Sequence, residues 1–140
     1  MAVASSTHAQ TVSVSDLANS IVGDVIVNND VPSQSIAQSF TTGSDPSTLF
    51  SVTLQIGVQF LNIANGGGGF SVSLYDDNNG LPGASLAVLT GNDTPSFEAL
   101  LSSYTPSVST PLTASTPYWI VASVPQPSPL QTYGLKATAI

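Results

Sequence analysis

Apolar and hydroxyl-bearing residues alternate along much of this chain, with the period of a strand that has one buried and one solvated face. The clearest examples are residues 11–15 (TVSVS), 51–54 (SVTL) and 70–75 (FSVSLY). Six further segments are predicted to be strands: 21–27, 36–42, 85–90, 97–101, 117–124 and 132–138. About nine short strands at near-regular spacing predict an all-β fold, an antiparallel, jelly-roll-like β-sandwich.

Clusters of Gly, Asn, Asp and Pro separate the predicted strands, as turns require. They occupy residues 43–46, 65–69, 76–80 and 91–93. Asn79 and Gly80 stand between two apolar runs, and both can adopt the positive φ angles of a tight hairpin. The one hint of helix is a single turn at residues 15–19, with Ser15 as its cap.

A length of 140 residues predicts one domain, which we place at residues 11–140. Residues 1–10 are expected to be a flexible arm or the remnant of a signal peptide. The small residues up to Ala9 resemble the end of a secretory signal, but they lack its basic and hydrophobic parts. Both interpretations of this segment remain open.

Charged residues make up only 6% of the chain, and eight acids face a single base, Lys136. The net charge of −7 excludes the basic patch that nucleic acids require. It also excludes a polybasic membrane anchor, and no run reaches the roughly 18 apolar residues of a membrane helix. Without Cys, disulfides and thiolate chemistry are excluded as well.

Few residues could support catalysis. The single His, His8, lies in the predicted arm, where nothing would orient an imidazole for a Ser-His-Asp system. The single Glu, Glu98, has no arranged carboxylate partner of the kind that glycoside hydrolysis needs. The sequence therefore predicts a protein that is not an enzyme, and no cofactor is expected apart from a structural Ca²⁺ ion.

That Ca²⁺ ion would bind the oxygen-rich loop at residues 76–80, with Asp76, Asp77 and Asn79 as candidate ligands. The loop lacks the alternate ligand spacing of an EF-hand and its downstream Glu. A turn rich in Asn and Asp needs no metal to explain it, so both interpretations stand.

Glycan-binding modules stack exposed aromatic rings on sugar faces. The candidates are Tyr118 and the single Trp, Trp119, which are neighbours in a predicted strand and so cannot both face the core. Other candidates are Tyr75, Tyr104 and Tyr133. The alternative is that most of these rings fill the core.

Four segments in order resemble a known family: residues 38–43 (QSFTTG), 51–54 (SVTL), 70–83 (FSVSLYDDNNGLPG) and 112–121 (LTASTPYWIV). The sequence is similar over residues 35–124 to the choice-of-anchor R domain of bacterial exported proteins. The resemblance implies a secreted or cell-surface β-sandwich and transfers no catalytic residues. We do not expect this copy to be anchored by the family's usual route, because the residues up to Ile140 include no sorting signal or hydrophobic tail.

A surface with so few charges can pack closely against copies of itself, and its edge strands lack guarding lysines. The predicted N-terminal strand could complete a neighbour's sheet, through Thr11, Val12, Ser13, Val14 and Ser15. We therefore expect a structural subunit of an extracellular assembly, such as a filament, surface layer or virion surface, whose partners are copies of itself. The alternative is a monomeric module that binds polysaccharide or another surface ligand.

Overall fold

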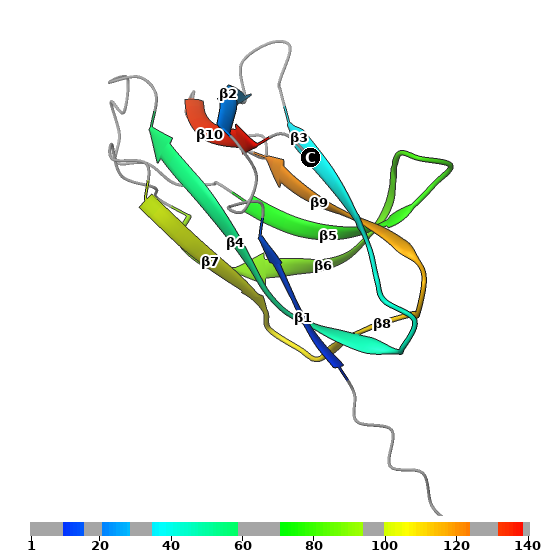
Figure 1. The fold of residues 1–140 in the computed structure, drawn as a ribbon. Coiled ribbons are helices and arrows are strands. Elements are labelled where there is room, and N and C mark those ends of the chain that lie inside the picture. Colours follow the sequence, from blue (N-terminus) through cyan, green and yellow to red (C-terminus); the bar gives the residue numbers. More distant parts are fainter. Residues whose placement is uncertain are drawn as a thin grey trace, which may run out of the picture.

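The computed structural model describes the backbone of residues 10–15, 21–28, 35–58, 71–93, 100–123 and 132–138, and side chains within 35–55, 71–93 and 101–123. Ten strands and no helix occur in these ranges (Figure 1), which confirms the all-β prediction. The strands are β1 (Gln10–Ser15), β2 (Ile21–Asn28), β3 (Ile36–Thr41), β4 (Ser47–Val58), β5 (Ser71–Asp77), β6 (Pro82–Thr90), β7 (Leu100–Pro106), β8 (Thr110–Leu112), β9 (Pro117–Ser123) and β10 (Thr132–Thr138).

The sheet is organised around its longest strand, β4. One edge of β4 pairs with β1 and then with β10, while the other edge pairs with β8 and then with β7. From β10 the sheet continues to β2, and from β7 it continues through β6, β5 and β9 to β3. These pairings are antiparallel except that of β1 with β4, which is parallel.

The sheet curls into a half-barrel (Figure 1), and β7 carries the hydrogen-bonded ladder around the bend. Its first five residues pair with β4, whereas Thr105 and Pro106 pair with β6. The structure therefore shows a curled, mainly antiparallel sheet in which β7 is shared by both halves, and it does not show the two separate sheets of a sandwich, which stay a prediction.

A β-bulge at Phe50 changes which residues of β4 face inward. Consecutive residues of β1 pair with Leu49 and Ser51, so Phe50 is the extra residue on β4. Leu49 is buried before the bulge and Val52 after it, although these positions are not in phase along a regular strand. The bulge thus keeps both halves of β4 in the core and leaves the Phe50 ring 62% exposed.

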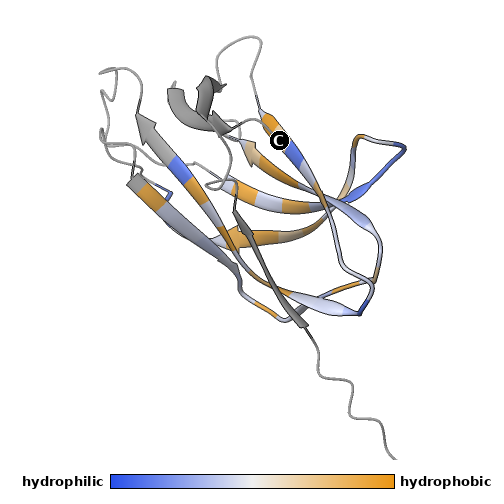
Figure 2. Ribbon diagram, in the orientation of Figure 1, coloured by the Kyte–Doolittle hydropathy of each residue, from blue (hydrophilic) through white to orange (hydrophobic). Residues whose placement is uncertain are grey.

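The core fills the space enclosed by the curl and draws on β4 to β9. Figure 2 shows hydrophobic positions recurring along β4, β5, β6 and β9. Burying a Leu or Val side chain contributes about 1.5–3 kcal/mol relative to leaving it exposed, so this cluster is the main source of stability. The buried residues are Leu49, Val52, Val72, Leu74, Leu89, Tyr104, Leu112, Tyr118, Ile120 and Ala122.

Thr42, at the end of β3, ties that strand to the turn between β8 and β9. Its buried hydroxyl donates to the Thr113 carbonyl at 2.6 Å and accepts from the Thr116 amide at 2.9 Å. The Thr42 amide donates to the Thr116 carbonyl at 3.1 Å, and the Ser115 amide donates to the Gly43 carbonyl at 2.7 Å. This network holds the turn in place, including Ser115 at a φ of 51°.

Several strand boundaries differ from the predicted ones. The segment predicted at 51–54 is only the middle of β4, because the bulge interrupts its alternation. The segment predicted at 97–101 overlaps only the start of β7, and β8 is not predicted because Pro111 argues against a strand. Ser15 belongs to β1, and the rest of the expected helical turn lies outside the described residues, as does the arm up to residue 9.

Candidate functional site

β9 presents its two large aromatic residues to opposite faces of the sheet. Tyr118 is 6% exposed and stacks on Phe40, with the ring centroids 5.9 Å apart. Its hydroxyl accepts a hydrogen bond from the Thr113 amide at 2.9 Å. Tyr118 is therefore a core residue. Of the two predicted ligand-binding aromatics, only Trp119 lies half-buried on the outer face.

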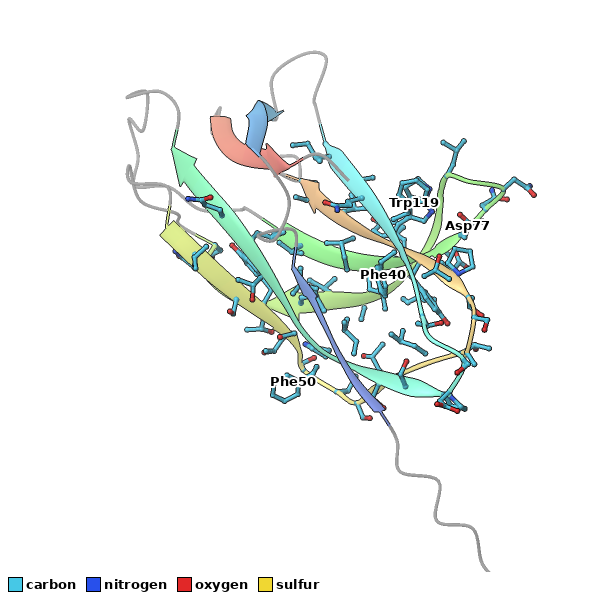
Figure 3. All side chains as sticks on the ribbon, viewed as in Figure 1. Phe40, Phe50, Asp77 and Trp119 are labelled. Carbon is cyan, nitrogen blue, oxygen red and sulfur yellow. The ribbon has the colours of Figure 1, made fainter. Side chains whose placement is uncertain are left out.

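The Trp119 indole is fixed by a carboxylate from another strand. Its Nε1 donates to Oδ1 of Asp77, at the end of β5, across 2.8 Å (Figure 3). The other oxygen of that carboxylate, Oδ2, accepts from the Gly80 amide at 3.2 Å. Asp77 thereby connects the indole to the hairpin between β5 and β6.

A second aromatic side chain lies beside Trp119. Tyr75 of β5 is directly opposite Trp119 in the antiparallel ladder, so both half-buried rings are on the outer face. Directly paired residues have Cβ atoms about 4.5–5.5 Å apart. Two exposed serines extend the row, since Ser39 pairs with Trp119 and Ser85 pairs with Tyr75. We call these two rings the Tyr75–Trp119 pair.

The hairpin that carries Asp77 is closed by a two-residue turn. Asn79 and Gly80 have φ angles of 55° and 83°, which fits the sequence expectation and a type I′ turn. The Asn78 amide donates to the Leu81 carbonyl at 2.8 Å, and the Leu81 amide donates back to the Asn78 carbonyl at 3.3 Å. These two bonds fix the register of the turn beside the aromatic pair.

The predicted Ca²⁺ ligands take part in the hairpin's own hydrogen bonds. Oδ1 of Asp76 accepts from the Ala84 amide, while both oxygens of Asp77 accept as described above. Asn79 donates from Nδ2 to Oδ1 of Asn78 at 3.3 Å. Among the described residues, no group of three or more His, Cys, Asp or Glu side chains could hold a metal ion. Ca²⁺ binding at this loop stays a prediction.

Gly83 permits the close approach of Asp76 to the start of β6. A Cβ at this position would lie 2.3 Å from Oδ1 of Asp76, which is closer than real Cβ contacts. Any larger residue would push the carboxylate away from the Ala84 amide. The glycine therefore keeps the β5 end of the hairpin in its present shape.

A second surface feature is the outer face of β4, β7 and β6, where large apolar side chains are exposed. Phe50 of β4 is 62% exposed, Leu101 of β7 is 60% exposed and Val88 of β6 is 63% exposed. Val108, in the connection from β7 to β8, is 69% exposed. We call these four residues the apolar outer face. Sequence analysis missed it because alternation alone does not reveal which strands lie side by side.

The strand predicted to mediate assembly, residues 11–15, is part of β1. Within the described residues β1 pairs only with β4 of the same chain, in register from Gln10 opposite Ser47 to Ser15 opposite Thr53. Whether the same strand also pairs with a neighbouring copy stays a prediction.

His8 and Glu98, the residues considered for catalysis, lie outside the described residues. The described part of the chain contains no helix long and apolar enough to cross a membrane.

Family models, curated proteins and solved structures were each compared with the chain, and none matches it. The resemblance to the choice-of-anchor R domain stays a prediction.

Proposed function

We propose that this protein is a non-enzymatic structural subunit of an extracellular assembly, such as a filament, surface layer or virion surface, and that copies associate through the apolar outer face. The observation that carries the proposal is the exposure of Phe50, Leu101, Val88 and Val108 on or beside three adjacent strands. Large apolar side chains gathered on one surface are typical of interaction sites.

The register places Phe50, Val88 and Val108 near the end of β7, while Leu101 lies nearer its start, opposite Gln55. β7 lies between β4 and β6, and its end pairs with β6 through Pro106 opposite Leu89. Val88, the neighbour of Leu89, therefore points outward next to the connection that carries Val108. Phe50 lies on the other side of β7, at the bulge of β4.

The charge distribution supports a second copy as the partner. None of the residues of β4, β6 and β7 is Asp, Glu, Lys or Arg. Two copies can therefore bring these strands together without desolvating charges and without like-charge repulsion at the contact. A partner recognised by complementary charge would find no counterpart on these strands.

Two finer expectations belong to the same proposal. The jelly-roll-like sandwich is supported by a common core, in which Leu49 and Val52 of β4 pack with Leu74 of β5 and Ile120 of β9. Secretion is supported by the resemblance to the choice-of-anchor R domain and by a composition poor in charge.

Sedimentation velocity over a range of concentrations tests the proposal. We expect the wild-type chain to form larger species as its concentration rises. The triple variant Phe50→Thr, Val88→Thr, Leu101→Thr should associate at least about tenfold more weakly, because it loses apolar contact area while keeping residues that suit strands. Leu81→Thr is the matched control, because Leu81 is 66% exposed at the hairpin tip, away from this face.

Ionic strength is a further variable in the same experiment. An interface without charges should keep its affinity, or strengthen slightly, as salt is raised. A wild-type chain that stays monomeric at every concentration would contradict the proposal, and so would a triple variant that associates as strongly as the Leu81→Thr control.

A further inference from the structure

We propose that the Tyr75–Trp119 pair binds a neutral polysaccharide, with the sugar rings lying along the outer face of β5 and β9. This inference goes beyond the proposed assembly, because it concerns different strands and different residues. It rests on three observations: the cross-strand register of the two rings, the fixed orientation of the indole, and the groups around them.

The register places two rings next to each other on a surface. Tyr75 and Trp119 are direct cross-strand partners, and both are half-buried from the outer face. Side chains that stand on neighbouring strands of a sheet form a shelf and do not surround a ligand. A pyranose ring has an apolar C–H face, which can lie on such a shelf.

The indole is held in position before any ligand arrives. The bond from Nε1 to Oδ1 of Asp77 fixes Trp119, and Asp77 is itself held by the Gly80 amide. Side chains that are already ordered lose less conformational entropy when they bind a partner. Figure 3 shows the Trp119 side chain close to Asp77. A ring held in this way is better suited to stacking than one that is free to rotate.

Hydrogen-bonding groups flank the pair on both sides. The exposed serines Ser39 and Ser85 continue the same cross-strand row. Serine hydroxyls can both donate and accept, and the Asp77 carboxylate can accept from further donors, which matches the hydroxyl groups around a sugar ring. The row therefore consists of two neighbouring aromatic residues with one serine hydroxyl on each side.

Charge decides which class of glycan fits. The Asp77 carboxylate is adjacent to the pair, and the four strands that carry the row, β3, β5, β6 and β9, contain no Lys or Arg. Glycans with carboxylate or sulfate groups would meet the Asp77 carboxylate and no cation on these strands. An ammonium ligand prefers rings that enclose it, and this pair is a shelf. An uncharged glycan is therefore the ligand that the site fits.

Isothermal titration calorimetry with the complete chain tests this inference. The probes are four neutral hexasaccharides, namely cellohexaose, xylohexaose, maltohexaose and mannohexaose, with hexagalacturonate as the anionic counterpart. We expect at least one neutral probe to bind and hexagalacturonate not to bind. Because Trp119 is the only Trp of the chain, binding should also change its fluorescence.

Variants connect any binding to the two rings. Tyr75→Ser should weaken binding by about tenfold or more, and Trp119→Phe, which keeps a smaller ring, should weaken it less. Leu101→Thr, on the apolar outer face, is the control and should bind as the wild type does. Urea unfolding of each variant establishes that it is folded before its affinity is compared.

The inference is overturned if none of the four neutral probes binds, if hexagalacturonate binds in preference to them, or if the folded Tyr75→Ser and Trp119→Phe variants both keep wild-type affinity. The same variants should sediment as the wild type does. Failure of glycan binding and failure of self-association are therefore separate results.

Discussion

The ring of Tyr104 lies directly against the backbone of Gly91. A Cβ atom at Gly91 would be 2.3 Å from Cδ1 of that ring and 2.8 Å from the carbonyl oxygen of Ser103. The Tyr104 side chain is 1% exposed, and its hydroxyl donates to the Asn92 carbonyl at 2.7 Å. The segment after β6 thus folds tightly over β7, at a position where any side chain would collide.

Replacing Gly91 with Ala should lower the free energy of unfolding by about 1–3 kcal/mol, because the ring and the backbone must separate to admit the methyl group. Urea unfolding monitored by circular dichroism measures the loss. Asp93→Ala, two residues further on at an exposed position, is the control and should change stability by less than about 0.5 kcal/mol. Equal stabilities of the two variants would show that the close contact is absent in solution.

The Thr42 hydroxyl provides a second test. Thr42→Val has nearly the same shape but leaves the Thr113 carbonyl and the Thr116 amide without the partner described above. We expect a loss of about 1–3 kcal/mol in the free energy of unfolding. Thr42→Ser keeps the hydroxyl and should retain most of that stability. The comparison is valid if the free energy of unfolding falls with denaturant concentration at the same slope in each variant. A Val variant as stable as the Ser variant would refute the role of the hydroxyl.

The bulge makes an unusual prediction about deletions in β4. Removing Phe50 restores regular alternation between Leu49 and Val52, so both stay on the inner face. Removing Thr53 instead turns one half of the strand inside out. We expect the Phe50 deletion to fold and the Thr53 deletion not to fold, as judged by near-ultraviolet circular dichroism and cooperative unfolding. If both deletions behave alike, Phe50 is not the extra residue.

The absence of Cys allows a direct test of β1. Thr11 and Thr48 are direct partners in the parallel pairing of β1 with β4, at a separation that a disulfide can span. We expect the double variant Thr11→Cys, Thr48→Cys to form a disulfide within one chain when it is oxidised at low concentration. Non-reducing electrophoresis distinguishes that product from a linked dimer.

The control for that experiment is a mixture of the two single variants. A disulfide between Thr11→Cys and Thr48→Cys chains, formed only in the mixture, would show that β1 crosses between copies. The N-terminal strand would then mediate assembly, as the sequence led us to expect. Linkage confined to the double variant would assign β1 to its own sheet.

Alternation was sufficient to predict an all-β fold, because period-two patterning follows directly from a half-buried strand. It was insufficient where local chemistry broke the period. The bulge at Phe50 breaks the alternation, so the first part of β4 was not predicted. Pro111 argued against a strand at β8, although Thr110 and Leu112 on either side of it are buried as strand residues are. Curling into a single sheet depends on β7 changing partners, which no local pattern reveals.

The aromatic site was predictable only in part. Adjacent positions in a strand require Tyr118 and Trp119 to face opposite ways, but the sequence does not say which one faces outward. Trp119 has two partners, Asp77 and Tyr75, and both are on β5. Asp77 is 42 residues away from Trp119 in the sequence, and Tyr75 is its cross-strand partner. Such neighbours follow from the register of the sheet, which is set by the whole fold.

The sharing of β7 between the two halves of the curled sheet has a mechanical consequence. Its end is joined to β6 by two residue pairs, Leu89 with Pro106 and Thr90 with Thr105. Pro106 has no amide hydrogen to contribute to that ladder. A force that pulls β4 and β5 apart would therefore act on this short pairing of β6 with β7. The half-barrel would open there before its longer strand pairings separate.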